Sequence, residues 1–169
     1  MDKIISKREH VSMTPDSVLE DLLEGNRRFA QNNLDTRDQI SLKNIATDGQ
    51  YPKAIILFCV DSRVPVETIF DQSIGDIFVF RVAGNFVNTD ILGSMEYACK
   101  VAGSKLVFVL GHEKCGAVSS ACDHVELGNI TSMLKNIKPA IENTSTEGER
   151  SSKNAEFVQA VVEKCTIKH

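Results

Sequence analysis

The sequence predicts an α/β protein with a three-layer, mostly parallel β-sheet flanked by helices. Two continuous apolar runs, at residues 54–58 and 106–110, are typical of strands that are buried on both faces of a parallel sheet. Helical patterns separate the predicted strands, and strands that alternate with helices favour parallel connections. Each run also stops just before a short motif with chemically active side chains. The first motif is Cys59–Arg63 and the second is His112–Cys115.

We expect the chain to begin with an amphipathic helical arm over about residues 14–32. Thr14 suits the cap position and Pro15 the first helical position. The apolar residues of this arm fall on one stripe, namely Val18, Leu19, Leu22, Leu23, Phe29 and Ala30. Such a stripe should pack on another surface. A polar stretch is expected to follow the arm as far as Gly49.

The predicted sheet occupies the middle of the chain. Its elements in order are a strand ending at Cys59, a short helix at 65–70, a strand at 76–82, a helix at about 90–101 and a strand ending at Gly111. Further helical patterns cover 115–121, about 130–141 and 154–164, with a polar segment at 143–153. The whole chain, residues 1–169, is therefore expected to form a single domain.

Composition excludes several classes of function. The 169 residues are 42% hydrophobic and carry a formal net charge of -4, so the chain lacks the basic excess that nucleic-acid or anionic membrane surfaces require. No apolar stretch reaches transmembrane length, and the first residues lack the apolar core of a signal peptide. Five cysteines without Cys-x-x-Cys spacing indicate reduced thiols. We therefore expect a cytoplasmic protein with no nucleic-acid or membrane partner.

The two motifs at the strand ends supply metal ligands. Cys59, His112 and Cys115 offer two thiolates and an imidazole, a set that suits zinc. Ligands at the carboxyl ends of parallel strands meet in one crevice. Three protein ligands leave a fourth position, which Asp61 or water could take. This is the pattern of a catalytic metal site.

Asp61 and Arg63 are alternate residues, so in an extended segment both side chains project to the same side. A guanidinium can hold a carboxylate through two hydrogen bonds. The pair is either a surface ion pair of little energetic value, or a device in which Arg63 decides whether Asp61 binds the metal or leaves room for water. The residues alone leave both interpretations open.

The motif Cys59-x-Asp61-x-Arg63, together with His112-x-x-Cys115, resembles the β-class carbonic anhydrases. The similarity extends over 50–53, 59–64, 81–85, 96–98 and 111–117, and over Gly75 and Phe78. The resemblance implies a carbonate dehydratase, a zinc lyase that converts carbon dioxide reversibly to bicarbonate and a proton by zinc-bound hydroxide. It implies Cys59, His112 and Cys115 as zinc ligands and Asp61 with Arg63 as the catalytic dyad, with Asp61 a possible fourth ligand in a closed form.

The resemblance also implies a substrate pocket and a partner. Plant-type members line the pocket with glutamine, phenylalanine and tyrosine, which correspond to Gln50, Phe78 and Tyr97. A homodimer or a higher homo-oligomer is expected, with Phe78 and Tyr97 reaching the partner's metal. The inhibitory bicarbonate pocket of some members needs a tryptophan and a glycine where this chain has Ile56 and Phe58. The chain is therefore interpreted as the non-allosteric subtype.

Alternatives stay open at this point. A carbonyl sulfide or carbon disulfide hydrolase would keep the same ligands, and a catalytically silent zinc-binding subunit is a further possibility. The family usually continues past a helix like 154–164 into another helix and a final strand, whereas this chain ends at His169. We accordingly expect the C-terminal edge strand to be missing.

Overall fold

The computed structural model describes residues 4–167 and forms two compact units. The first unit contains the chain up to Ile56 together with Ser62–Phe80 and Asp90–Phe108, and the second contains Leu57–Asp61, Arg81–Thr89 and the chain from Val109 onward. Among the residues described, no helix is both long and apolar enough to cross a membrane. The expectation of a single domain over residues 1–169 stays a prediction. His169 lies outside the described residues.

The sheet has three parallel strands in the order β2-β1-β3. They are β1 (Ala54–Phe58), β2 (Ile77–Arg81) and β3 (Leu106–Val109), which confirms the predicted strands. Every residue of β1 is buried, as its central place in the sheet requires, whereas β2 is half-buried throughout. Backbone bonds continue past the strands, because Val82 N–H donates to Phe58 O and Leu110 N–H to Leu57 O. These bonds fix the register of the segments that follow each strand.

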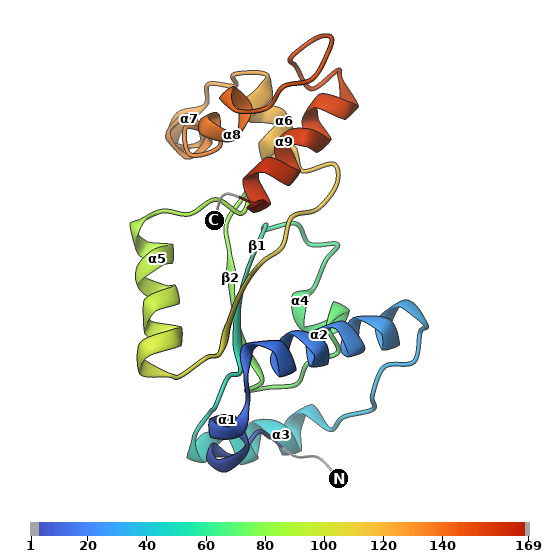
Figure 1. Cartoon of the computed structure of the whole chain (residues 1–169), viewed down its shortest axis with the longest axis vertical. Helices are drawn as coiled ribbons and strands as arrows, with labels where there is room; N and C mark the ends of the chain where they lie inside the picture. The colour runs from blue at the N-terminus through green and yellow to red at the C-terminus, as the bar shows by residue number, and fades with distance from the viewer. Residues whose placement is uncertain (1–3, 168–169) are drawn as a thin grey trace. The chain divides into compact units, whose positions relative to one another are not determined.

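Helices flank the sheet, which confirms the predicted α/β layering. Helices α2 (Pro15–Ala30) and α4 (Val66–Ile69) pack on each other on one side of it, and α5 (Thr89–Glu96) lies on the other (Figure 1). The helix predicted at 90–101 ends in a π-helical turn, η2 (Tyr97–Val101). Such a turn holds one more residue than an α-helical turn and is frequent near functional sites.

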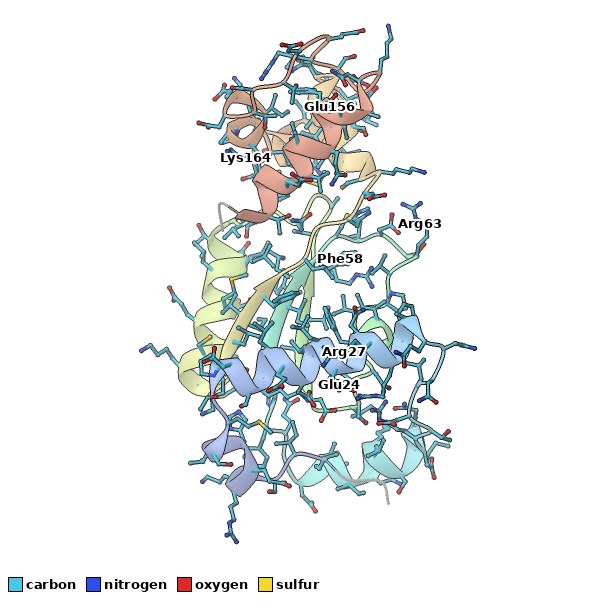
Figure 2. All side chains as sticks on the ribbon, turned by 45° about the vertical axis from the view of Figure 1, so that its right-hand side comes forward. Glu24, Arg27, Phe58, Arg63, Glu156 and Lys164 are labelled. Carbon is cyan, nitrogen blue, oxygen red and sulfur yellow. The ribbon has the colours of Figure 1, made fainter. Side chains whose placement is uncertain are left out.

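The N-terminal arm forms as α2. Thr14 caps it through a reciprocal hydrogen-bond pair with Ser17, and a proline lies in the first turn, as predicted. The predicted apolar stripe is partly wrong, because Leu23 and Phe29 are exposed. The buried face follows Val18, Leu22 and Gly25, a spacing of four and then three residues that keeps one line facing α4. The exposed face carries the ion pair of Glu24 with Arg27 (Figure 2).

Three short helical elements fall in segments that were not expected to be helical. They are α1 (Lys7–Ser12), α3 (Gln39–Ile45) and the 3-10 turn η1 (Ala46–Asp48). Ser6 and Glu9 form a capping box for α1, and Asp38 caps α3 by accepting the N–H groups of Ile40 and Ser41. The polar stretch predicted as far as Gly49 thus contains α3 and η1, for which no helix was predicted, because side-chain caps start helices too short to show a clear period.

The part of the second unit that the structure describes contains the helices α6 (Gly116–Cys122), α7 (Gly128–Leu134), α8 (Lys138–Glu142) and α9 (Ala155–Ile167). The single helix predicted at 130–141 was wrong, because it breaks between α7 and α8. Pro139 lies in the first turn of α8, where its missing N–H costs nothing, and could not continue a preceding helix. Arg150 joins α8 to α9 by donating to the carbonyls of Thr144 and Ile141 and stacking on the Phe157 ring.

Gly25 should be the least replaceable residue of the arm. A Cβ built there would lie 1.8 Å from the carbonyl oxygen of Phe70, so α2 could not stay against the end of α4. We expect Gly25→Ala to lower the free energy of unfolding by about 3 kcal/mol, the upper end of overpacking costs. Urea denaturation measures it. Gly93→Ala in α5 is the matched control, because a Cβ there meets nothing within 4 Å, and it should stabilise the protein by up to about 1 kcal/mol. Equal losses in both variants would contradict the close packing of α2 on α4.

The buried carboxylate of Asp71 links the N-terminal arm to the turn after α4. Asp71, whose side chain is 2% exposed, accepts from Arg28 Nε and Arg37 Nη1, each at 2.5 Å. Burial alone would raise the pKa of Asp71, but the hydrogen bonds from these two guanidiniums hold it below its ordinary value. Because the folded pKa is the lower one, this stabilisation is present above the unfolded pKa of about 3.9 and is lost as the pH falls through the folded pKa.

Asp71→Asn should therefore destabilise the protein and flatten its acid response. We expect a loss of roughly 2–4 kcal/mol at neutral pH, somewhat below the cost of breaking a wholly buried pair because both guanidiniums keep some exposure. Denaturant unfolding at pH 7 and pH 3 measures the effect. The difference in the free energy of unfolding between pH 7 and pH 3 should be smaller in this variant than in the wild-type protein. It should be unchanged in Asp35→Asn, an exposed neighbour in the same cluster. An unchanged difference in Asp71→Asn would contradict the role of Asp71 in the acid response.

Candidate metal centre

The first motif follows β1 directly. Cys59 is buried and its sulfur accepts the N–H of Gly84 at 3.4 Å, while Val60 is exposed. Segment 81–84 therefore lies along segment 58–61 within the second unit. A backbone N–H donated to sulfur stabilises the thiolate form.

The second motif follows β3 and starts α6. Cys115 is buried at the N-cap of α6, as predicted, and Lys114 just before it has a φ of +54°. A side-chain-bearing residue rarely adopts this left-handed conformation, so the local fold must hold it there. The turn brings His112 and Cys115 back toward the end of β1.

The three predicted ligands meet. The ligand atoms of Cys59, His112 and Cys115 all lie within 4.8 Å of one another, and the two sulfurs are 3.8 Å apart. All three residues belong to the second unit. Within the described residues, this is the group of histidine, cysteine and acidic side chains that could hold a metal ion. Two sulfurs and one imidazole nitrogen form a donor set that zinc prefers.

The imidazole of His112 is oriented for a metal. Its Nδ1 lies 2.9 Å from the carbonyl oxygen of Glu113, which can only accept a hydrogen bond, so Nδ1 must carry the proton. Nε2 then carries the lone pair, and it is buried without a hydrogen-bond partner among the described residues. A buried unpaired nitrogen is costly, and a metal ion would satisfy it. The Phe58 ring packs on this imidazole with its centroid at 5.4 Å.

The two thiols influence each other's ionisation. The hydrogen bond between the sulfurs, with that from Gly84 N–H, lowers the pKa of Cys59. The same sulfur contact, together with burial, raises the pKa of Cys115. Ionisation of one thiol therefore opposes ionisation of the other, and burial adds to the cost of a second thiolate. A dication placed between them favours two thiolates, so metal binding should release a proton.

The carboxylate of Asp61 lies beside the cluster but does not belong to its ligand group. Its Oδ2 is 3.8 Å from His112 Nδ1, and its side chain is largely buried. Arg63 belongs to the first unit and is exposed on the loop after β1 (Figure 2). The pairing of Asp61 with Arg63, and the coordination role of Asp61, stay predictions.

The expected pocket residues belong to the first unit. Gln50 is exposed just before β1, Phe78 is half-buried in β2, and Tyr97 is 58% exposed at the start of the π-helical turn. Their contribution to a substrate pocket stays a prediction. The exposure of Tyr97 contrasts with the core packing expected of an aromatic residue on a helix against a sheet.

Arg81 was not assigned any role from the sequence. Its Nε donates to the carbonyl oxygen of Cys59 at 3.0 Å, and its Nη2 donates to the carbonyl oxygen of Asp61. Its guanidinium also lies over the Phe58 ring, 5.4 Å from the centroid. In the sequence it is a basic residue at the end of an apolar strand, within the stretch 81–85 that resembles the family, and neither signal reveals a partner 22 positions earlier.

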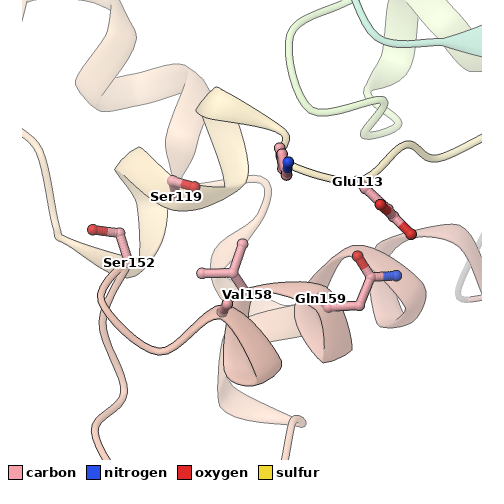
Figure 3. A pocket seen from close by; sticks show the side chains of 7 residues that line it. Glu113, Ser119, Ser152, Val158 and Gln159 are labelled. Atoms are coloured by element: carbon pink, nitrogen blue, oxygen red, sulfur yellow. The ribbon is translucent and has the colours of Figure 1, made fainter.

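A pocket of about 380 Å³ lies next to the second motif, between α6 and α9 (Figure 3). Glu113, Ser119 and Gln159 are among its lining residues. It contains none of the three ligand side chains. Its lining does include Glu113 and Lys114, the two residues between His112 and Cys115.

Cysteine and histidine side chains that converge after parallel strands are the arrangement expected of an α/β metalloprotein. The carbonic anhydrase family model matches residues 54–169. Carbonic anhydrase 2 of Mycobacterium tuberculosis is 43% identical over 110 residues, which are 64% of this chain and 53% of that protein. The carbonic anhydrase of Mycolicibacterium smegmatis is 38% identical over 126 residues, or 71% of this chain and 61% of that protein.

A solved structure, that of the β-carbonic anhydrase CcaA, matches with a TM-score of 0.65 at 25% identity, over 89% of this chain and 76% of that one. The chain therefore belongs to the carbonic anhydrase family, in its β class. It spans about half the length of the first curated relatives that it matches.

Proposed function

We propose that this chain catalyses the reversible hydration of carbon dioxide to bicarbonate and a proton, with zinc bound by Cys59, His112 and Cys115. One observation carries the proposal: three soft and borderline donors converge within 4.8 Å, and the buried Nε2 of His112 has no other partner in the described part of the chain. The similarity to proteins named as carbonic anhydrases supports the choice of reaction.

The chain's residues would divide the chemistry as follows. Bound zinc supplies a Lewis acid that makes water a competent nucleophile near neutral pH. The Asp61 carboxylate would accept a hydrogen bond from the attacking water and orient it toward carbon dioxide. Arg63 would hold Asp61 away from the metal. The Glu113 carbonyl keeps the proton of His112 on Nδ1, so that Nε2 stays available as a ligand.

Gln50, Phe78 and Tyr97 are proposed to hold carbon dioxide, in the manner of plant-type family members. A homodimer or higher homo-oligomer would bring Phe78 and Tyr97 to the metal of a second copy. The 58% exposure of Tyr97 supports this arrangement, because a large aromatic side chain left in water is suited to an interface. We further propose a cytoplasmic location and the non-allosteric subtype, the latter because Ile56 and Phe58 occupy the positions that the bicarbonate pocket would need.

Stopped-flow measurement of carbon dioxide hydration on protein of known zinc content tests the function. We expect activity that rises in proportion to bound zinc. Carbonyl sulfide should be hydrolysed much more slowly by the same sample, if at all. Zinc-loaded protein that hydrates no carbon dioxide would overturn the proposal. Efficient carbonyl sulfide hydrolysis in that sample would select the hydrolase alternative, and inertness toward both substrates would select a silent zinc-binding subunit.

A further inference from the structure

Arg81 ties the first motif to the end of the neighbouring strand. It donates to the carbonyl oxygens of Cys59 and Asp61, the residues on either side of exposed Val60. Cys59 is a predicted metal ligand, and Asp61 carries the predicted catalytic carboxylate. A planar guanidinium with donors in a fixed fork can fix both carbonyls at once, which sets the backbone between them.

Two further contacts make this connection stiff. Val82 N–H donates to Phe58 O, and Gly84 N–H donates to the sulfur of Cys59. Three of the four residues from 81 to 84 therefore bond to segment 58–61, all within the second unit. A ligand loop held at so many points has little freedom to leave its geometry.

The Phe58 ring links Arg81 to His112 of the second motif. The Arg81 guanidinium lies over the Phe58 ring at 5.4 Å from the centroid, and the same ring packs on the His112 imidazole with the two centroids 5.4 Å apart. A cation over an aromatic face is attracted by the ring quadrupole. The guanidinium, the Phe58 ring and the imidazole thus form a chain that joins the backbone of one motif to the side-chain ligand of the other.

We propose that Arg81 is a positioning residue of the metal centre, which holds the Cys59–Asp61 backbone and, through Phe58, the His112 ring in metal-binding geometry. The inference rests on the proposed function, because it assumes that these residues bind zinc. Residues that orient ligands in this way typically contribute 10- to 100-fold in metal affinity or activity. Lysine cannot replace arginine here, because a single ammonium lacks the planar fork.

The chain offers a matched control in the same unit. Arg150 also donates to two backbone carbonyls, those of Thr144 and Ile141, and lies over a phenylalanine ring, that of Phe157 at 4.7 Å. None of these residues belongs to the metal group. Arg150→Lys therefore removes the same kinds of interaction as Arg81→Lys without touching the ligand loop.

The test compares zinc affinity, measured by competition with a chelator, and the visible absorption of the cobalt-substituted protein. We expect Arg81→Lys to weaken zinc binding roughly 10- to 100-fold and to shift the cobalt bands, which report ligand geometry. Arg150→Lys should alter neither measurement. Equal effects of the two substitutions, or no effect of Arg81→Lys, would overturn the inference. A wild-type protein that binds no zinc would instead refute the proposed function.

A second measurement needs no variant. In wild-type protein, NMR should show that the Nε–H of Arg81 exchanges with solvent more slowly than that of Arg27, which donates to Glu24 in an exposed pair. Slow exchange is expected because the carbonyl oxygen of Cys59 accepts this N–H. Exchange as fast as that of Arg27 would overturn the inference, whether or not Arg81→Lys folds.

Discussion

Replacing His112 by alanine should reduce bound zinc from about one ion per chain to almost none and abolish carbon dioxide hydration. The imidazole is the only nitrogen donor in the group, and the two remaining sulfurs would have to share a dication with solvent. Cys59→Ser should have a similar effect, because a serine hydroxyl is a far weaker zinc ligand than a thiolate. Elemental analysis together with stopped-flow kinetics measures both losses.

His124→Ala is the matched control for this experiment. His124 is an exposed histidine of the second unit, and it does not belong to the metal group. Its replacement should leave zinc content and activity unchanged. If His112→Ala and Cys59→Ser both retained zinc at full stoichiometry, the three-residue ligand assignment would be wrong, even if activity were lost.

The central sheet could be predicted because its strands leave a strong trace in the sequence. Residues 54–58 are apolar without interruption, and the structure buries all five of them in β1. β2 and β3 also end within one or two residues of the predicted limits. Burial on both faces removes the usual alternation of apolar and polar residues, and this leaves a run that is easy to recognise.

Short helices and helix breaks were less predictable, because local side-chain contacts decide them. Helix α1 has six residues, too few for an apolar period, and it depends on the Ser6 and Glu9 capping box. That box was a visible signal, as was Pro139 at the break between α7 and α8. The π-helical turn after Glu96 had no such signal, because the apolar pattern around Tyr97 fits an ordinary α-helix equally well.

The candidate metal ligands could be chosen from the sequence because each follows a recognisable strand and has a donor chemistry that zinc prefers. The contacts that hold these residues in place could not be predicted. The bonds from Arg81 and Gly84 to the Cys59 segment span 20 to 25 positions, and no periodicity marks such a pair. The same limit applies to the proton on His112 Nδ1, which depends on the carbonyl of the next residue in a turn that Lys114 completes at positive φ.

Asp61→Asn should separate chemistry from metal binding. An amide has nearly the same shape as a carboxylate but no negative charge, so zinc should stay at about one ion per chain. Hydration should nevertheless fall by roughly 10²–10⁴-fold, because the attacking water loses the anionic acceptor that orients it. Arg63→Ala should resemble this variant, since an unrestrained Asp61 carboxylate could occupy the open position on the metal. Zinc content and kcat, measured on the same samples, test both variants.

The control for the dyad is Asp123→Asn. Asp123 is an exposed carboxylate in the second unit, and it accepts the N–H of Ser152, so its replacement removes one charge from that unit without touching the metal group. Its hydration rate should match that of the wild-type protein. Adding zinc should not restore the hydration rate of Asp61→Asn, because this variant keeps its zinc. The two dyad variants should differ in inhibitor binding. An anionic inhibitor that needs the open metal position should bind Arg63→Ala more weakly than it binds Asp61→Asn. Wild-type rates in both dyad variants would show that Asp61 and Arg63 form no more than a surface ion pair.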